Sequence, residues 1–268
     1  MSGGSRYVHL VDTPPGDPSV RPAATDRRIP FDVVFNVRDL GGLRTSSGGF
    51  TRRGVLYRGD GVQRLAGADL DRARALRLET VIDLRTLGEI ERSGRFPIED
   101  YPLRWYSLPI LERMWSDDDL APTTGAVDFL RDRYLAMLDE GVRSLAQIVE
   151  IVAEGSTVLF HCAAGKDRTG VTAAVLLGLL EVPAAEIIDD YHATAGAMAA
   201  FVDWLSSTRP EAIDAMTSQP PEYLEAPAAA MAGFLQAVDE RFGSMEGYVT
   251  GIGVPAATIE QLRAALVV

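Results

Sequence analysis

The stretch from position 156 to position 180 restricts the fold of this chain more than any other part of the sequence. Residues 156–160 are mostly apolar, as in a short buried strand, and they are followed by a loop that contains two glycines. Residues 171–180 are apolar enough for a buried helix. A buried strand that leads through a loop into a buried helix is typical of α/β proteins with a mainly parallel sheet.

The sequence before this stretch favours the same fold class. Residues 69–78 and 127–153 have helical patterns, and Gly141 is expected to divide the longer helix. Residues 80–84 are typical of a short apolar strand, and residues 105–110 are a second candidate. The alternation predicts an α/β protein in which helices flank a central, mostly parallel sheet.

Beyond Pro183 the sequence is helical and poor in strand signals. We expect residues 29–268 to form a single domain, in which residues 184–242 form helical decoration or a lid. Residues 1–28 lack the apolar region of a signal peptide, and we expect them to form a loose arm. The segments with helical patterns are residues 187–205, 228–242 and 256–266.

Composition and charge exclude some classes of protein. The 268 residues include 38 acidic and 26 basic side chains, giving a net charge of −12, whereas a general nucleic-acid binder needs a basic face. No apolar run approaches the roughly 18 residues of a membrane span, so we expect no membrane insertion. A single cysteine cannot form an intramolecular disulfide and favours a reducing compartment, here the cytoplasm, although export without a signal peptide stays open.

Asparagine, cysteine and lysine each occur once in the chain, and the cysteine and the lysine fall in one short segment. The chain has a single cysteine, Cys162, and a single lysine, Lys166, among 26 basic residues. Both lie in residues 161–170, which read HCAAGKDRTG. One lysine placed at random would fall in these ten positions with a chance of 10/268, or roughly 4%.

Within this segment, Cys162 and Arg168 have the spacing Cys-x5-Arg, which suits cleavage of phosphate esters by a thiolate. A loop that joins a strand end to a helix N-terminus points backbone N–H groups at an anion, and the helix dipole favours an ionised Cys162. Arg168 can hold two phosphoryl oxygens in its planar fork. The alternative is that Cys162 is a small buried apolar side chain. The charged residues around it would make a poor core segment, which favours a catalytic role.

Other residues of the segment have expected tasks. Gly165 permits a turn that a side chain would obstruct. Thr169 can donate its hydroxyl to the thiolate and stabilise it as the leaving group of a second step. His161 is expected to order the loop through hydrogen bonds. The expected substrate-binding residues are His161, Ala163, Ala164, Gly165, Lys166 and, from outside the segment, Arg58.

The segment resembles the signature loop of the cysteine-dependent protein tyrosine phosphatase superfamily. Its GKDRTG part is similar to that of the bacterial atypical tyrosine/serine and lipid phosphatases. The resemblance covers about residues 30 to 268. It implies a phosphatase fold and hydrolysis of phosphomonoesters through a phosphocysteine, with no metal or other cofactor. The flanking matches are residues 36–42, with Val37 in place of an aromatic residue, 56–58, 81–85 with Glu89, 223–224, 242–244 and 247–248.

Two groups outside the segment have alternative interpretations. Asn36, Arg38 and Asp39 precede two glycines, so they either form a turn or brace the phosphate loop through hydrogen bonds. Arg58 either adds positive potential at the mouth of the pocket or is a solvated surface arginine.

Three aspartates compete as the general acid that protonates the leaving oxygen. Asp83 is favoured, because a carboxylate in an apolar strand needs a partner or a task and because its position matches the acid of the resembling family. Asp167 follows, since it belongs to the phosphate loop itself. Asp117 comes third, because it loosely resembles the acid loop of eukaryotic tyrosine phosphatases but also begins a run of acidic residues typical of a solvated loop.

Alternative functions are a phosphate-binding module without activity, a sulfurtransferase and an arsenate reductase. The expected partner is a phosphorylated protein or a phosphoinositide. A deep pocket would select phosphotyrosine, and a wide one would also accept phosphoserine, phosphothreonine or phosphoinositides. Lys166 is expected to favour polyanionic substrates, or else only to pair with Asp167 and stiffen the loop.

Overall fold

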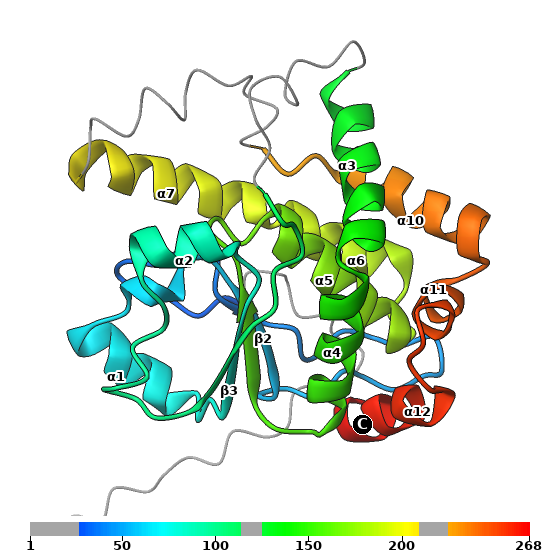
Figure 1. Cartoon of the computed structure of the whole chain (residues 1–268), viewed down its shortest axis with the longest axis horizontal. Helices are drawn as coiled ribbons and strands as arrows, with labels where there is room; N and C mark the ends of the chain where they lie inside the picture. The colour runs from blue at the N-terminus through cyan, green and yellow to red at the C-terminus, as the bar shows by residue number, and fades with distance from the viewer. Residues whose placement is uncertain (1–26, 114–124, 209–224) are drawn as a thin grey trace, which may run out of the picture.

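The computed structural model describes residues 27–113, 125–208 and 225–268, and a five-stranded sheet lies at its centre (Figure 1). The strand order is β1-β2-β5-β3-β4; β1 pairs antiparallel with β2, and every other pairing is parallel. The predicted α/β fold with a mostly parallel sheet is therefore confirmed. The strands are β1 (Arg38–Asp39), β2 (Leu56–Gly59), β3 (Thr80–Asp83), β4 (Arg104–Ser107) and β5 (Val158–His161).

Helices cover both faces of this sheet, with α1 on one face and most of the others on the opposite face (Figure 1). The described helices are η2 (Val62–Arg64), α1 (Gly67–Ala75), α2 (Leu87–Ser93), α3 (Ala126–Glu140), α4 (Val142–Ala153), α5 (Asp167–Leu179), α6 (Ala184–His192), α7 (Thr194–Thr208), α10 (Ala228–Phe242), α11 (Met245–Gly251) and α12 (Ala256–Leu266).

Side chains of the central strands alternate between two apolar cores. Val81 and Leu159 pack with residues of α1, whereas Ile82 and Phe160 pack with residues of α3 to α6 and α10 to α12. Every residue of β2, β3 and β5 is buried. A parallel sheet covered on both faces explains why these strands are mostly apolar rather than alternating in sequence.

A glycine divides the long predicted helix, as the sequence indicated. Gly141 separates α3 from α4. A Cβ atom at this position would lie 2.8 Å from the Met137 carbonyl oxygen and 3.1 Å from a methyl group of Ile110. The junction therefore packs too closely for a side chain, and α3 and α4 can both lie against the core.

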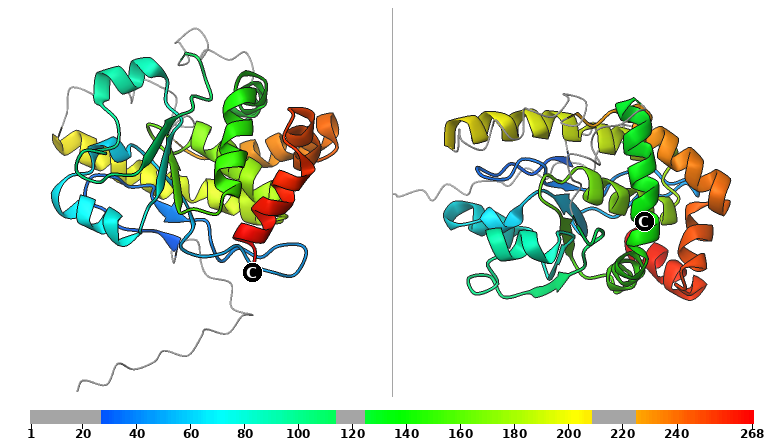
Figure 2. Two further views of the ribbon diagram at one scale, coloured as in Figure 1. Left: turned by 60° about the horizontal axis from the view of Figure 1, so that its bottom comes forward. Right: turned by 45° about the horizontal axis from the view of Figure 1, so that its top comes forward.

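The segment predicted to be a lid contains more than one helix. Residues 187–205 have a helical pattern, and the structure divides them between α6, which ends at His192, and α7, which begins at Thr194. α7 extends along one end of the molecule, past α2 (Figure 2). Phe201 and Trp204 of α7 contact Phe35, with ring centroids 6.2 and 5.9 Å away. Movement of this segment as a lid stays a prediction.

The start of the described chain is tied to the domain. Arg27 is only 3% exposed and donates hydrogen bonds to the Asp39 carbonyl oxygen and the Asp190 carboxylate. Arg27 belongs to residues 1–28, which the sequence predicts to be a loose arm. Residues 1–26 of that arm lie outside the described residues. Among the three described ranges, no helix is long and apolar enough to cross a membrane.

Candidate active site

The loop between β5 and α5 lies where the central strands end. Its residues 162–166, which we call the phosphate loop, follow β5 and lead into α5 at Asp167. Cys162 is 2% exposed and has a free thiol. The crevice at the carboxyl ends of parallel strands is the usual ligand site of α/β proteins, and a helix N-terminus favours an anion there. The fold therefore places Cys162 where a phosphate group would bind.

Gly165 is required by the shape of the phosphate loop. Its φ angle is +67°, in the left-handed region that favours glycine. A Cβ atom would also lie 2.6 Å from the Gly59 carbonyl oxygen and 2.8 Å from Nδ2 of Asn36. The loop thus turns directly against the end of β2 and the Asn36 side chain.

Side chains from distant parts of the sequence hold the backbone of the phosphate loop. Nδ2 of Asn36 donates to the carbonyl oxygens of Ala164 (3.1 Å) and Gly165 (2.9 Å). Nη2 of Arg58 also donates to the Gly165 carbonyl oxygen (2.8 Å), and the Gly61 amide donates to that of Ala163 (3.1 Å). Asn36 therefore lies where a bracing residue must lie, which was one of its two interpretations.

Asp190 of α6 forms ion pairs with three arginines beneath the phosphate loop. Its carboxylate accepts hydrogen bonds from Arg27 (2.8 Å), Arg38 (3.0 Å) and Arg58 (2.6 Å). Burial alone would raise the pKa of Asp190, but the three guanidinium groups outweigh it and hold the pKa far below its ordinary value. The cluster links the start of the described chain, β1, β2 and α6 to the phosphate loop through Arg58.

The structure corrects the expectation for Arg58 and, for Asp39, agrees with the turn that was one of its two interpretations. Arg58 is 1% exposed and contacts the loop backbone from within the protein, so it is neither a surface residue nor at the pocket mouth. Burial and the neighbouring Arg38 lower the pKa of Arg58 to about 10. Asp39 accepts hydrogen bonds from the amides of Gly41 (2.7 Å) and Gly54 (2.9 Å), which is a turn role rather than a bracing one.

Glu89 of α2 holds the guanidinium of Arg168. Two hydrogen bonds, of 2.6 and 3.0 Å, join the two side chains. Glu89 is itself fixed in a capping box with Thr86 at the start of α2. Burial lowers the pKa of Arg168, but the charges of Cys162 and Glu89 outweigh this effect and raise it. The sequence indicated Glu89 only as part of a family match and gave it no role.

Asp83 is a buried carboxyl group that pairs with an arginine. It is fully buried and accepts hydrogen bonds from Nε (2.9 Å) and Nη2 (2.6 Å) of Arg85, while Nε2 of His161 lies 3.6 Å away. Burial raises the pKa of Asp83, but His161 and Arg85 outweigh this and lower it. Nδ1 of His161 lies 3.1 Å from the Cys162 carbonyl oxygen, and burial lowers the pKa of this imidazole. Asp83 and His161 therefore support the end of β5.

Asp167 differs from the other carboxylates of the site because its side chain is 26% exposed. Its Oδ1 accepts a hydrogen bond from the Tyr134 hydroxyl (2.6 Å) and lies 3.7 Å from Nζ of Lys166. Thr169 is fully buried, and its hydroxyl has no hydrogen-bond partner in the part of the chain that the structure describes. Asp117, the third candidate acid, lies outside the described residues.

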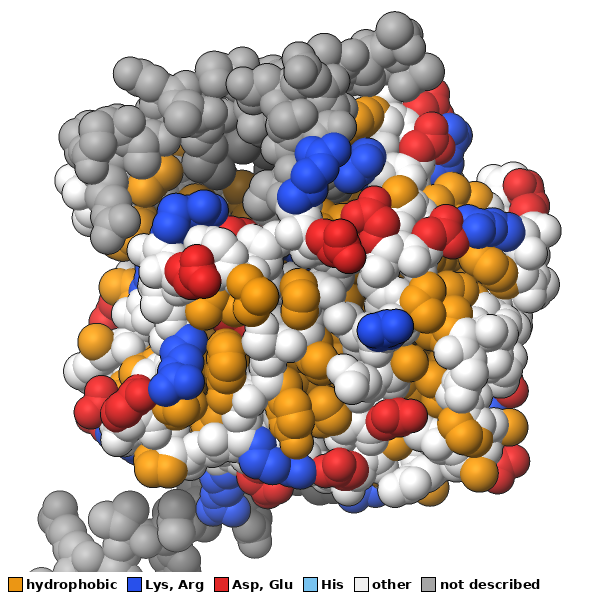
Figure 3. Space-filling view, in the orientation of Figure 1, with side chains coloured by type: hydrophobic (Ala, Val, Ile, Leu, Met, Phe, Trp, Pro, Cys, Tyr) orange, Lys and Arg blue, Asp and Glu red, His pale blue; other side chains and the backbone are white. Residues whose placement is uncertain are grey.

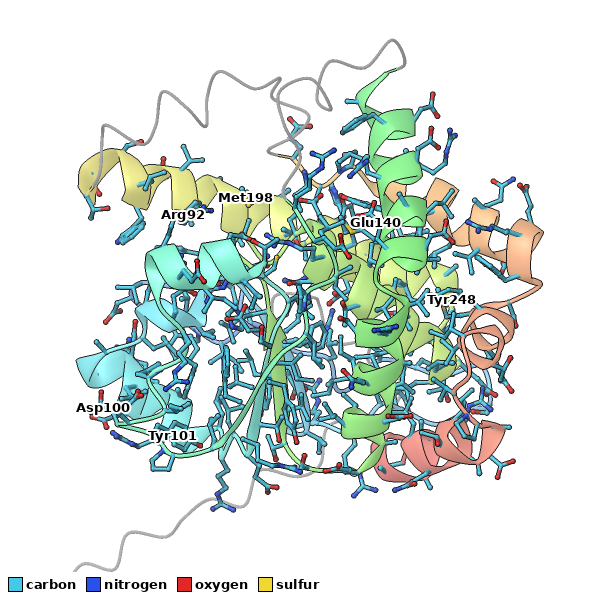
Figure 4. The ribbon with its side chains drawn as sticks, viewed as in Figure 1. Arg92, Asp100, Tyr101, Glu140, Met198 and Tyr248 are labelled. Carbon is cyan, nitrogen blue, oxygen red and sulfur yellow. The ribbon has the colours of Figure 1, made fainter. Side chains whose placement is uncertain are left out.

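A cavity of about 380 Å³ lies in front of the phosphate loop. Figure 4 labels Arg92 on α2 and Met198 on α7, the two helices that border this region. Several cationic side chains face the cavity, as binding of an anion requires. The lining residues are Gln63, Arg64, Arg85, Glu89, Arg92, Ser93, Ala163, Ala164 and Phe201.

On the face drawn in Figure 3, acidic and basic side chains are interspersed with apolar ones. Among the described residues, no group of three or more His, Cys, Asp or Glu side chains is arranged to hold a metal ion.

The sequence pattern of the tyrosine phosphatase family matches residues 29–268. The chain belongs to the tyrosine phosphatase family. It is 31% identical over 227 residues to a protein of Cupriavidus necator named as a tyrosine-protein phosphatase, with 82% of each chain covered. The resemblance seen in residues 161–170 is therefore confirmed, and the chain is a cysteine-dependent phosphatase. The match does not favour a sulfurtransferase, an arsenate reductase or an inactive phosphate-binding module.

Two further relatives match most of the chain. A tyrosine-protein phosphatase of Nostoc commune is 29% identical over 275 residues, covering 96% of this chain and 82% of its own. The triple specificity protein phosphatase PtpB of Mycobacterium tuberculosis is 26% identical over 273 residues, covering 87% of this chain and 96% of its own.

Removing the charge of Asp190 is expected to destabilise the phosphatase at neutral pH. Asp190→Asn leaves three buried arginines without their shared carboxylate, which costs about 3 to 5 kcal/mol. Because the pKa of Asp190 is depressed in the folded protein, its contribution is complete above the unfolded pKa of about 3.9 and is lost as the pH falls below it. Urea unfolding should show a wild-type advantage that is constant from about pH 7 to pH 5 and smaller near pH 3.

Asp139→Asn is the matched control, because Asp139 pairs with Arg241 (2.8 Å) on the surface, where the two side chains are 53% and 49% exposed. Solvent screens this pair, so its loss should change the free energy of unfolding little. An Asp190→Asn protein as stable as the wild type at neutral pH would contradict the role given to the buried cluster.

Proposed function

We propose that this phosphatase hydrolyses phosphomonoesters through a phosphocysteine formed on Cys162. The observation that carries the proposal is the braced phosphate loop, which holds Cys162 at the N-terminus of α5 with Arg168 beside it. In the first step Sγ of the thiolate attacks phosphorus, an S–P bond forms, and the P–O bond to the leaving group breaks. In the second step water attacks phosphorus, the S–P bond breaks, and inorganic phosphate leaves with the thiolate restored.

Arg168 binds two phosphoryl oxygens and stabilises the charge that spreads over them in both transition states. Its hydrogen bonds to Glu89 fix the plane of the guanidinium before substrate arrives. A group that is already oriented loses little conformational entropy on binding. Thr169, whose hydroxyl is buried in the first turn of α5, stabilises the thiolate as it leaves phosphorus.

Asp167 is the general acid of this proposal, and Asp83 is a structural carboxylate. An acid must hold a proton and reach the leaving oxygen. Asp83 is fully buried, and Arg85 and His161 favour its ionised form, whereas Asp167 is partly exposed beside the phosphate loop. Asp167 gives its proton to the leaving oxygen in the first step and takes one from the attacking water in the second. This reverses the order that the sequence favoured.

The proposed substrates are phosphotyrosine and, in addition, phosphoserine, phosphothreonine or phosphoinositides. The relative PtpB is named as a triple specificity phosphatase. In this chain three arginines line the cavity in addition to the loop. Arg64 and Arg85 pair with Asp60 and Asp83, so Arg92 is the lining arginine that this proposal assigns to a second anionic group of the substrate. Lys166 is a further cation next to the reacting group. We also place the protein in the cytoplasm, because a catalytic thiol needs a reducing environment.

Cys162→Ser is expected to abolish turnover of p-nitrophenyl phosphate while binding of a phosphotyrosine peptide is retained. The nucleophile is lost, but the backbone and Arg168 that bind the phosphoryl group remain. Steady-state kinetics and calorimetric binding of the peptide measure the two properties. Residual activity within about tenfold of the wild type would refute the phosphocysteine mechanism. Vanadate should inhibit the wild type, and a chelator should not.

Asp167→Asn is expected to flatten the basic limb of the pH profile of kcat/KM and to slow poor leaving groups most. A poor leaving group needs its proton in the transition state, whereas p-nitrophenolate does not. Asp83→Asn should instead lower the melting temperature, since it leaves Arg85 without its carboxylate. The acid would be reassigned if the leaving-group dependence followed Asp83→Asn and not Asp167→Asn.

Lys166→Ala is expected to lower kcat/KM at least several-fold more for a soluble phosphoinositide than for a phosphotyrosine peptide. The ammonium group would contact the additional charge of a polyanionic substrate, a difference of roughly 1 kcal/mol. An equal loss on both substrates would mean that Lys166 only pairs with Asp167 and stiffens the loop.

A further inference from the structure

We propose that Tyr134 is a positioning residue that directs the proton transferred by Asp167. The inference rests on the proposed function, in which Asp167 is the general acid. Tyr134 lies on the buried face of α3, 28 positions before the first residue of the phosphate loop. The structure places its hydroxyl at the reacting end of α5.

The Tyr134 hydroxyl is shared between two oxygens. It lies 2.6 Å from Oδ1 of Asp167 and 2.6 Å from the hydroxyl oxygen of Tyr191 on α6. The ring of Tyr134 is fully buried and makes edge contacts with Tyr191 and Phe234, at centroid distances of 5.9 and 6.2 Å. These contacts fix the hydroxyl, so the position of the Asp167 carboxylate is set from within the core.

The directions of both hydrogen bonds follow from counting protons. A tyrosine hydroxyl has one proton, and Tyr134 donates it to the Asp167 carboxylate, which has none to give when ionised. The Tyr191 hydroxyl must then donate to Tyr134. Burial, together with the charge of Asp167, raises the pKa of Tyr134 well above its ordinary value, so this hydroxyl stays protonated and remains a donor.

This arrangement has two consequences for proton transfer. Because Oδ1 of Asp167 accepts the Tyr134 proton, the proton that goes to the leaving oxygen is held on Oδ2. When Asp167 releases that proton, its new negative charge strengthens the bond from Tyr134, since hydrogen bonds to an ionised acceptor are the stronger ones. Tyr134 therefore stabilises the carboxylate that the first step produces, without changing its own protonation.

Two charged side chains and a second tyrosine also interact with Asp167, and they come from the loop, α5 and α6. The Lys166 ammonium is 3.7 Å from Oδ1, and the Arg168 guanidinium interacts electrostatically with the carboxylate. From α6, Tyr191 interacts with it in the same way. All three are retained in a Tyr134→Phe protein, so that variant isolates the hydroxyl of Tyr134.

Tyr134→Phe is expected to move the basic limb of the kcat/KM profile upward by about one pH unit. A hydrogen bond to the charged form of an acid favours that form, so its loss lets Asp167 keep its proton to higher pH. The loss of orientation should also lower kcat/KM about tenfold for a phosphoserine peptide and less than about twofold for p-nitrophenyl phosphate, whose leaving group needs no proton. Tyr191→Phe should produce a smaller shift in the same direction.

Tyr248→Phe is the matched control. Tyr248 is also a buried tyrosine, but its hydroxyl donates to the Leu138 carbonyl oxygen at 2.7 Å and not to a side chain of the site. Its pH profile should equal that of the wild type even if its melting temperature falls. A shift of the basic limb shared by Tyr134→Phe and Tyr248→Phe would show a general loss of packing and would overturn the inference.

A double variant separates this inference from the proposed function. If Tyr134 acts through Asp167, adding Tyr134→Phe to Asp167→Asn causes no further loss on the phosphoserine peptide. If the fold-losses in kcat/KM of the two single variants multiply in the double variant, Tyr134 does not act through Asp167; this result would overturn the positioning role while leaving Asp167 as the acid. If Asp167→Asn itself shows no leaving-group dependence, the acid assignment fails first and the role of Tyr134 fails with it.

Discussion

The buried carboxylate of Asp190 is the interaction on which the geometry of the active site depends. Three arginines that belong to separate parts of the chain meet it, and each of them is at most 4% exposed. One of the three, Arg58, also donates a hydrogen bond to the Gly165 carbonyl oxygen of the loop. Arg38 donates to the backbone and side-chain carbonyl oxygens of Asn36. Asn36 in turn holds two carbonyl oxygens of the phosphate loop. The shape of the loop is thus fixed by groups beneath it.

The acidic groups of the site are divided between support and chemistry by their surroundings. Asp190, Asp83 and Glu89 each face one or more guanidinium groups, and these groups lower the pKa of all three carboxyls despite the burial that opposes them. In each of the three, both carboxyl oxygens accept hydrogen bonds from guanidinium groups, so none of them is free to give a proton to a leaving oxygen. Asp167 faces a tyrosine hydroxyl and open solvent in addition to its cations, and it is the carboxyl group closest in sequence to Arg168. Environment therefore assigns the roles that residue type alone leaves open.

Local patterns in the sequence were sufficient for the sheet and for the centre of the phosphate loop. The strand at residues 156–160, the loop and the apolar helix after it follow from periodicity, and Cys162 and Arg168 follow from their spacing. The burial of Asp190 could have been predicted from the sequence. It lies three positions after Ile187 and therefore on the same, buried face of α6, where a carboxylate needs a partner. Its partners could not be predicted, because Arg58 lies 132 positions away and the chain is rich in arginine. The same abundance made Arg58 resemble an ordinary surface residue.

The cost of these buried charges indicates what they are for. Replacing a buried ion pair with apolar side chains of similar volume is often neutral or stabilising in proteins, so stability alone does not explain the Asp190 cluster or the Asp83–Arg85 pair. Apolar packing tolerates small displacements, whereas a bidentate or shared ion pair fixes both distance and angle. A loop that must hold a thiolate and bind phosphoryl oxygens is sensitive to displacements of about 1 Å. We infer that the charges beneath the phosphate loop are kept because they fix its position. Burial of the apolar cores on either side of the sheet offsets the free-energy cost of burying these charges.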